Sequence, residues 1–138
     1  MSNKEKAFIR ASRVAHLATT DKNGHPHIVP ICYVLDREDL YSPIDEKPKR
    51  TAPLRLKRIR NILTNPHVSV VVDRYEDDWT RLAYVLVRGK AQVLTRGGKH
   101  KRAVALLRKK YPQYRSMALH QRPIIRITST HCNSWGTL

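Results

Sequence analysis

The chain has 138 residues, with 27 Lys or Arg against 11 Asp or Glu and a formal net charge of +16 at pH 7. This length predicts one domain, residues 1–138, whose core is modest enough that a deep pocket would need a partner subunit. The charge excludes a neutral surface and predicts an anionic partner, which composition leaves open among nucleic acid, acidic lipid and a polyanionic small molecule.

Membrane and metal functions find little support in the sequence. The apolar segments are too short to span a bilayer and the first ten residues lack the apolar centre of a signal peptide, so we expect a cytoplasmic protein without a membrane partner. Cys32 and Cys132 have neither metal-ligand nor CxxC spacing, which predicts reduced thiols. The seven histidines contain no i, i+4 pair, and we expect no metal site.

The first third of the chain is typical of a helix followed by a hairpin. Lys4 to Ser12 mixes apolar and charged residues at helical spacing, and Val14 to Thr20 has the character of a strand. Asp21 to Gly24 ends in Asn-Gly, which favours a tight turn before a β-branched strand from His27 to Leu35. Pro30 cannot donate to a ladder, so we expect it at a sheet edge or a bulge, where strands often border ligands.

The remaining elements complete a β-dominated pattern. Gly89 interrupts a long strand and predicts a kink or bulge there. Six short strands with few helices predict a β-dominated α+β fold, a six-stranded antiparallel split β-barrel with peripheral helices, rather than a doubly wound sheet. The expected later elements are strands at Leu40 to Ile44, Val68 to Asp73, Leu82 to Leu94 and Ile124 to Thr128, and a helix at Lys99 to Tyr111.

The stretch KPKRTAPLRLKRIRNILTNP, Lys47 to Pro66, is the most distinctive local feature. Pro53 suits an early helical position with Thr51 as a cap, and Asn65 followed by Pro66 suits the stop. Backbone N–H groups at a helix start and forked guanidinium groups favour a phosphate. The alternative is that these cations only form a solvated helix face.

Several segments in order resemble one family. VAHLATTDKNGHPHIVPICYVLD, LYSPIDEKPKR, LRLKRIRNILTNPHVSVVVD, the DDW ending at Trp79 and VRGKAQVL resemble the flavin-binding split-barrel proteins. That group includes pyridoxamine 5′-phosphate oxidases and enzymes that use the deazaflavin coenzyme F420. KKYPQY and Trp135 extend the resemblance toward the deazaflavin-dependent branch.

The resemblance implies a cofactor site at a homodimer interface. It implies that Trp79 comes from the neighbouring subunit and contacts the ring or the interface, with simple packing as the alternative. Which of the cations in the basic stretch contacts phosphate directly stays open. The implied ring-bordering residues are Val29, Pro30, Ile31, Ser42, Pro43, Ile44 and Asp45, and the implied phosphate-binding residues are Lys49, Arg50, Arg55, Lys57, Arg58 and Asn61.

The resemblance thus predicts an oxidoreductase that transfers hydride between its cofactor and a small organic substrate, with F420 favoured over FMN because F420 is more anionic. No catalytic side chain is assigned, although Tyr33 or Tyr41 could deliver a proton. The alternatives are an FMN-dependent oxidase or reductase of the pyridoxamine-phosphate-oxidase-like class, a non-catalytic cofactor-binding protein, and a small barrel that binds nucleic acid. The scattered aromatic residues, 7% of the chain, count against nucleic acid because stacking platforms are missing.

Overall fold

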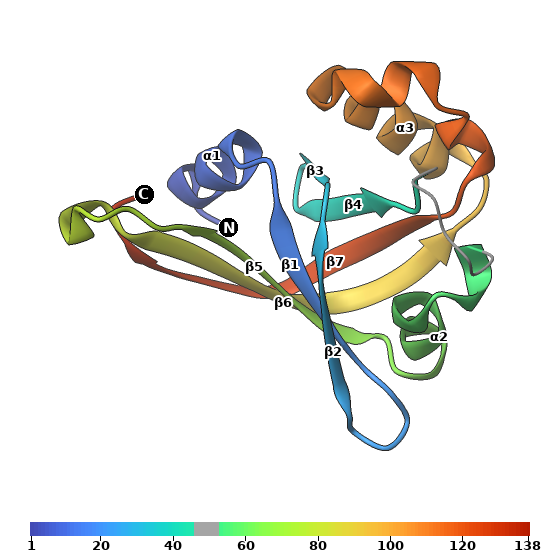
Figure 1. Ribbon diagram of the computed structural model, residues 1–138, viewed down its shortest axis with the longest axis horizontal. Coiled ribbons are helices and arrows are strands. Elements are labelled where there is room, and N and C mark those ends of the chain that lie inside the picture. The colour runs from blue at the N-terminus through green and yellow to red at the C-terminus, as the bar shows by residue number, and fades with distance from the viewer. Residues whose placement is uncertain (46–52) are drawn as a thin grey trace.

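A computed structural model describes residues 1–45 and 53–138. Over these residues the chain forms one antiparallel sheet of seven strands in the order β2-β1-β5-β6-β7-β4-β3, curled into a half-barrel (Figure 1). Helices α1, α2 and α3 lie at its periphery. The β-dominated class is therefore confirmed, while the strand count is seven rather than six.

The N-terminal elements follow the predicted boundaries closely. Helix α1, Asn3–Ala11, begins with a capping box in which Ser2 accepts from the Glu5 N–H and Glu5 accepts in return. Strands β1, Ala15–Thr20, and β2, Pro26–Ile31, form the predicted hairpin. Pro30 lies on β2, an edge strand of the sheet, as predicted.

The expected strand from His27 to Leu35 is two strands. After β2 the chain crosses to the opposite edge of the sheet, where β3, Val34–Asp36, pairs with β4, Asp39–Pro43. At the crossing the Tyr33 N–H donates to the Tyr111 hydroxyl at 3.1 Å, and that hydroxyl lies 3.1 Å from the Tyr33 carbonyl oxygen. A side chain thus replaces a strand neighbour, which ends the ladder and explains the additional strand.

The basic stretch forms two short helices instead of one. Pro53–Arg55 is a 3-10 turn, η1, and α2 runs over Lys57–Thr64 with Leu56 as an N-cap that provides no side-chain hydrogen bond. Pro53 therefore begins a separate turn, and the α-helix starts four residues later than predicted. Thr51, the expected cap, lies outside the described residues.

Three long strands form the centre of the sheet. They are β5, His67–Arg74, β6, Ala83–Leu94, and β7, Ile124–Gly136, which is much longer than the predicted Ile124 to Thr128. The register between β6 and β7 shifts at Gly89, as predicted. A Cβ atom there would lie 2.3 Å from the Thr128 carbonyl oxygen, so only glycine allows this approach. The β5–β6 connection contains η2, Trp79–Arg81, and forms a projecting tip (Figure 1).

Helix α3, Gly98–Lys110, and the turns η3, Pro112–Ser116, and η4, Leu119–Gln121, cover the β3–β4 end of the sheet (Figure 1). The buried apolar side chains divide into two clusters, a larger one inside the curled sheet and a smaller one beneath α3. None of the helices in the described part of the chain has the length and apolar character that a membrane span requires.

Candidate functional site

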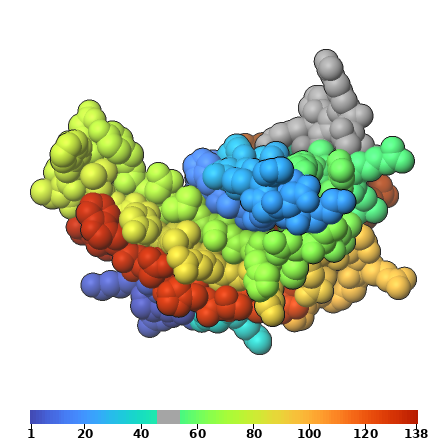
Figure 2. Space-filling view, turned by 90° about the horizontal axis from the view of Figure 1, so that it is seen from below, coloured from blue at the N-terminus to red at the C-terminus, as the bar shows by residue number. Residues whose placement is uncertain are grey.

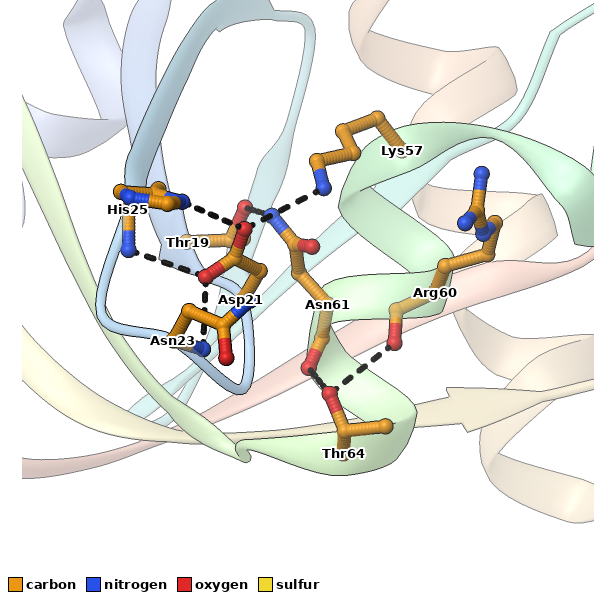
Figure 3. Close-up of polar contacts among 8 residues, drawn as sticks. All are labelled: Thr19, Asp21, Asn23, His25, Lys57, Arg60, Asn61 and Thr64. Carbon is orange, nitrogen blue, oxygen red and sulfur yellow. Dashed lines mark hydrogen bonds and ion pairs between the residues drawn. The ribbon is translucent and has the colours of Figure 1, made fainter.

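Helix α2 docks against the β1–β2 hairpin through groups that the chain satisfies by itself (Figure 3). The Asn61 Nδ2 donates to the Thr19 Oγ1 at 3.0 Å, and both residues are almost fully buried, at 2% and 1% exposure. The Lys57 Nζ lies 3.6 Å from the Asp21 Oδ2. Both side chains point from the helix toward the hairpin (Figure 3), so this face of α2 is occupied by intramolecular contacts.

Asp21 organises the hairpin turn that receives Lys57. Its Oδ1 accepts from the backbone N–H of Asn23 at 2.8 Å and of His25 at 2.9 Å. These hydrogen bonds, that of His25 above all, hold the pKa of Asp21 down to about 2, so the carboxylate is charged at neutral pH. Gly24 completes the turn with a φ of 82°.

A second polar group lies where the end of β4 meets η3 and η4. We call Ser42, Asp45, Arg58, Tyr114 and Arg122 the seam cluster. The Ser42 hydroxyl donates to the Cys32 carbonyl at 2.8 Å and the Tyr114 hydroxyl donates to the Asp45 Oδ2 at 3.2 Å. The Arg122 Nη2 donates to the Asp45 carbonyl at 3.0 Å. The cluster therefore joins the end of β4 to the β2–β3 crossing and to the η3–η4 region, which are distant from it in sequence.

Arg58 is the member of the seam cluster with an unsatisfied donor. Its Nε is buried and has no hydrogen-bond partner among the residues that the structure describes. Burial lowers the pKa of Arg58, while the nearby Asp45 carboxylate opposes that shift. A guanidinium stays charged at physiological pH, so a buried N–H on it requires an acceptor. Of the predicted phosphate ligands, Arg58 therefore retains an unused donor directed away from bulk water.

The predicted ring-bordering residues lie on two nearby segments but face different ways. Ile31 is buried in the core and Val29 is half-buried against it, whereas Pro30 is exposed on the outer face of β2. The second segment, residues 42–45, is buried throughout. The Ser42 hydrogen bond to the Cys32 carbonyl holds the two segments together.

Other predicted site residues are separated from the seam cluster. Trp79 is 71% exposed on the β5–β6 tip, at the opposite end of the molecule from α2 (Figure 1). Arg55 is exposed on η1. Lys49 and Arg50 lie outside the described residues. Of the predicted set, Ser42, Asp45 and Arg58 belong to the cluster, and the Ile44 carbonyl accepts from the Arg122 Nε at 3.3 Å.

Tyr114 and Arg122 are members of the seam cluster that the sequence did not indicate as site residues. Tyr114 falls within KKYPQY, a segment that carried the resemblance but suggested no role. Burial raises the pKa of its hydroxyl, which keeps it a hydrogen-bond donor to Asp45. The tyrosines suggested as proton donors are differently placed. The Tyr33 hydroxyl donates to the Ile9 carbonyl at 2.6 Å in the core, and Tyr41 is buried on β4.

The geometry of the described residues supports neither a metal site nor a proton-donating carboxylate at Asp78. No three His, Cys, Asp or Glu side chains gather into a metal-binding group within residues 1–45 and 53–138. The Asp78 Oδ1 accepts from the N–H and hydroxyl of Thr80, at 3.1 and 2.6 Å, and so caps η2. Those bonds lower the pKa of Asp78, which suits a structural carboxylate better than a proton donor.

Comparison with known proteins places this geometry in a family. The model for the pyridoxamine 5′-phosphate oxidase family, PNPOx_N, matches residues 1–136. The chain belongs to this family. A relative from Streptomyces rimosus subsp. rimosus is 31% identical over 102 residues, which cover 73% of this chain and 69% of the relative. That relative is a 5a,11a-dehydrotetracycline/5a,11a-dehydrooxytetracycline reductase.

Solved structures share the fold of this pyridoxamine 5′-phosphate oxidase family member. The conserved hypothetical protein Rv2991 from Mycobacterium tuberculosis superposes with a TM-score of 0.79 at 20% identity, covering 99% of this chain and 85% of that one. An FAD-binding protein from Mesorhizobium loti superposes with a TM-score of 0.70 at 26% identity, covering 97% and 94%. The split-barrel architecture expected from the sequence therefore fits the structure.

Proposed function

We propose that the chain is an oxidoreductase that binds a flavin-type cofactor, F420 in preference to FMN, and exchanges a hydride with a small organic substrate. The buried, unpartnered Nε of Arg58 carries the proposal, because it marks a place where the fold requires an acceptor that the described chain does not provide. Family membership, a reductase among the relatives and an FAD-binding neighbour support a redox cofactor.

The residues of the seam cluster fit an anionic cofactor tail. Arg58 would donate charge-assisted hydrogen bonds to a phosphate, and Lys57 and Arg55 would contribute longer-range attraction from the same segment. Asn61 would act indirectly, since its Nδ2 already donates to Thr19 and fixes α2 against the hairpin. When bound, the ring supplies the hydride chemistry, and the protein provides binding, orientation and exclusion of water.

The uncovered face of the central strands supports a homodimer that completes the site. Val71 and Leu86, directly opposite one another on β5 and β6, are only half-buried there. Tyr84 and Trp135 stack with ring centres 6.1 Å apart, and Trp135 is 55% exposed. This face lies open between the β5–β6 tip and the β1–β2 hairpin (Figure 2). We propose that a second copy covers it and brings its Trp79 toward the cofactor site.

The decisive experiment is a parallel titration of the purified protein with F420, FMN and riboflavin, followed by fluorescence. We expect tight binding of F420 and weaker binding of FMN. Added salt should weaken F420 binding more than riboflavin binding. Salt screens the attraction between phosphate and the basic side chains, and riboflavin has no phosphate. Absence of binding for all three compounds would overturn the proposal.

Sedimentation tests the dimer separately. The protein should sediment as a dimer, and Leu86→Lys, which places a charge on the half-buried sheet face, should shift it toward monomer and weaken cofactor binding. Lys109→Glu, at an exposed position of α3, is the control and should leave the assembly unchanged. Arg88 is unsuitable as a control because it lies on the same strand face as Leu86. A monomer that binds the cofactor with undiminished affinity would contradict the shared site.

A further inference from the structure

A small cavity lies directly behind the seam cluster, between the end of β2 and η3. Its volume is about 210 Å³. Two tyrosine rings, a thiol, a thioether and one amide form its wall, and no charged side chain does. The lining residues are Cys32, Tyr111, Gln113, Tyr114 and Met117. A wall of this composition favours an apolar, polarisable ligand over an anion.

The walls of this thiol cavity are fixed by hydrogen bonds from outside it. The Arg108 Nε donates to the Tyr114 carbonyl at 3.2 Å, and its Nη2 donates to the Met117 carbonyl at 2.9 Å. The Tyr111 hydroxyl is held at the β2–β3 crossing, where the Tyr33 N–H donates to it. The rings of Tyr111 and Tyr114 are 5.4 Å apart and tilted by 58°. The cavity therefore exists before any ligand arrives.

The cavity is joined to the proposed cofactor site by two hydrogen bonds. The Cys32 carbonyl accepts from the Ser42 hydroxyl at 2.8 Å, and the Tyr114 hydroxyl donates to the Asp45 carboxylate at 3.2 Å. Ser42 and Asp45 belong to the segment that the family resemblance places beside the ring. A molecule in the thiol cavity would thus lie behind the same short segment that borders the cofactor.

We propose that the thiol cavity binds a small planar aromatic molecule. This binding role does not depend on the proposed function. An apolar cavity of about 150 Å³ is sufficient for benzene, so this one has room for one or two fused rings. Offset contacts with Tyr111 and Tyr114 and sulfur contacts with Cys32 and Met117 would hold such a ring.

Alkylation of the two cysteines in the cofactor-free protein tests binding. Iodoacetamide labelling is followed by mass spectrometry at Cys32, which lines the cavity, and at Cys132, which is half-buried on β7 and serves as the internal control. Indole at ten times its Kd should slow alkylation of Cys32 about elevenfold by mass action and leave Cys132 unchanged. Equal rates at Cys32 with and without indole, or equal slowing of both thiols, would overturn the assignment.

Methionine methyl resonances provide a second readout that needs no mutation. The chain has two methionines, Met1 and Met117, of which only Met117 lines the cavity. With ¹³C-methyl methionine labelling, indole should shift the Met117 signal through its ring current and leave the Met1 signal in place. Met117→Trp, which fills the cavity, should abolish the effect of indole on the Cys32 alkylation rate, while Gln121→Trp, at an exposed position of η4, should preserve it.

The outcomes separate the two proposals. If F420 or FMN binds but indole neither protects Cys32 nor shifts Met117, this inference fails and the proposed function stands. If indole enters the cavity but no cofactor binds, the cavity assignment stands and the proposed function fails.

Discussion

Arg58 and Lys110 are both half-buried cations, and each has one buried nitrogen, Nε and Nζ respectively, without a hydrogen-bond partner in the described part of the chain. Their surroundings differ. The Lys110 Nζ lies 4.0 Å from the centre of the Tyr33 ring and 5.4 Å from that of Tyr111. The faces of these rings are electron-rich and attract a cation. Arg58 belongs to the seam cluster, where the Asp45 carboxylate is its electrostatic partner.

The two cations also differ in whether they can lose their charge. Burial lowers the pKa of Lys110 to about 8, so a fraction of this amine is neutral near physiological pH. A guanidinium has no such option. We propose on this comparison that a buried cationic nitrogen marks a ligand site when neither an aromatic face nor deprotonation relieves it. Arg58 meets that condition and Lys110 does not.

Replacing Arg58 tests its side of the comparison most directly. Arg58→Ala should weaken cofactor binding by about 1.5 to 3 kcal/mol for each lost charge-assisted hydrogen bond, roughly ten- to hundredfold in Kd. Fluorescence titration measures this change. Arg60→Ala removes an exposed cation from the same helix and should change affinity far less. Equal losses in the two variants would indicate that only overall charge matters.

Asn61 sharpens the comparison because its donor is already used inside the chain. Asn61→Ala should lower the free energy of unfolding by about 1 to 3 kcal/mol, since the buried Thr19 hydroxyl loses its partner. Urea denaturation measures this change, and Asn3→Ala, at an exposed position of α1, is the control. If Asn61→Ala is fully stable but binds the cofactor much more weakly, Asn61 contacts the cofactor directly.

Lys110 should make the stability of the protein depend on pH. Its pKa of about 8 in the folded protein is below the usual value of about 10.4, so between these pH values the unfolded chain binds the additional proton. Lys110 should therefore contribute a free energy of unfolding that rises with pH across that window. Lys110→Met should be more stable than the natural protein below pH 8 and should lose this rise, as urea denaturation at several pH values would measure. Lys109→Met, on the exposed side of α3, should keep it.

Lys57 should give the smallest effect. Its exposed pair with Asp21, at 3.6 Å, contributes little to stability because solvent screens the two charges, and 1 M salt should remove even that. Lys57→Ala should consequently unfold at nearly the same urea concentration as the natural protein. A loss comparable to that of Asn61→Ala would mean that the pair, not the buried amide, anchors α2.

The sequence predicted the features that depend on neighbouring residues. Asn23 and Gly24 indicated the turn, Pro30 an edge strand and Gly89 a bulge, because each restricts the backbone at its own position. The break at Tyr33 was not predictable, since it depends on a hydroxyl 78 residues away. For the same reason the buried hydrogen bond from Asn61 to Thr19, 42 residues away, had no local signature. The seam cluster arises from such distant pairings, so its Tyr114 and Arg122 had no local signature.

Two prolines on the edge strand β2 affect how copies of this chain can associate. Pro26 and Pro30 pair with Thr20 and His16 of β1, and in a regular ladder a proline nitrogen must point away from its neighbour. The free edge of β2 therefore offers few donors to an approaching strand, even though Ile28 between them is 64% exposed. Fibre-like growth by strand addition is blocked at that margin. The dimer that we propose therefore uses the face of the sheet rather than this edge.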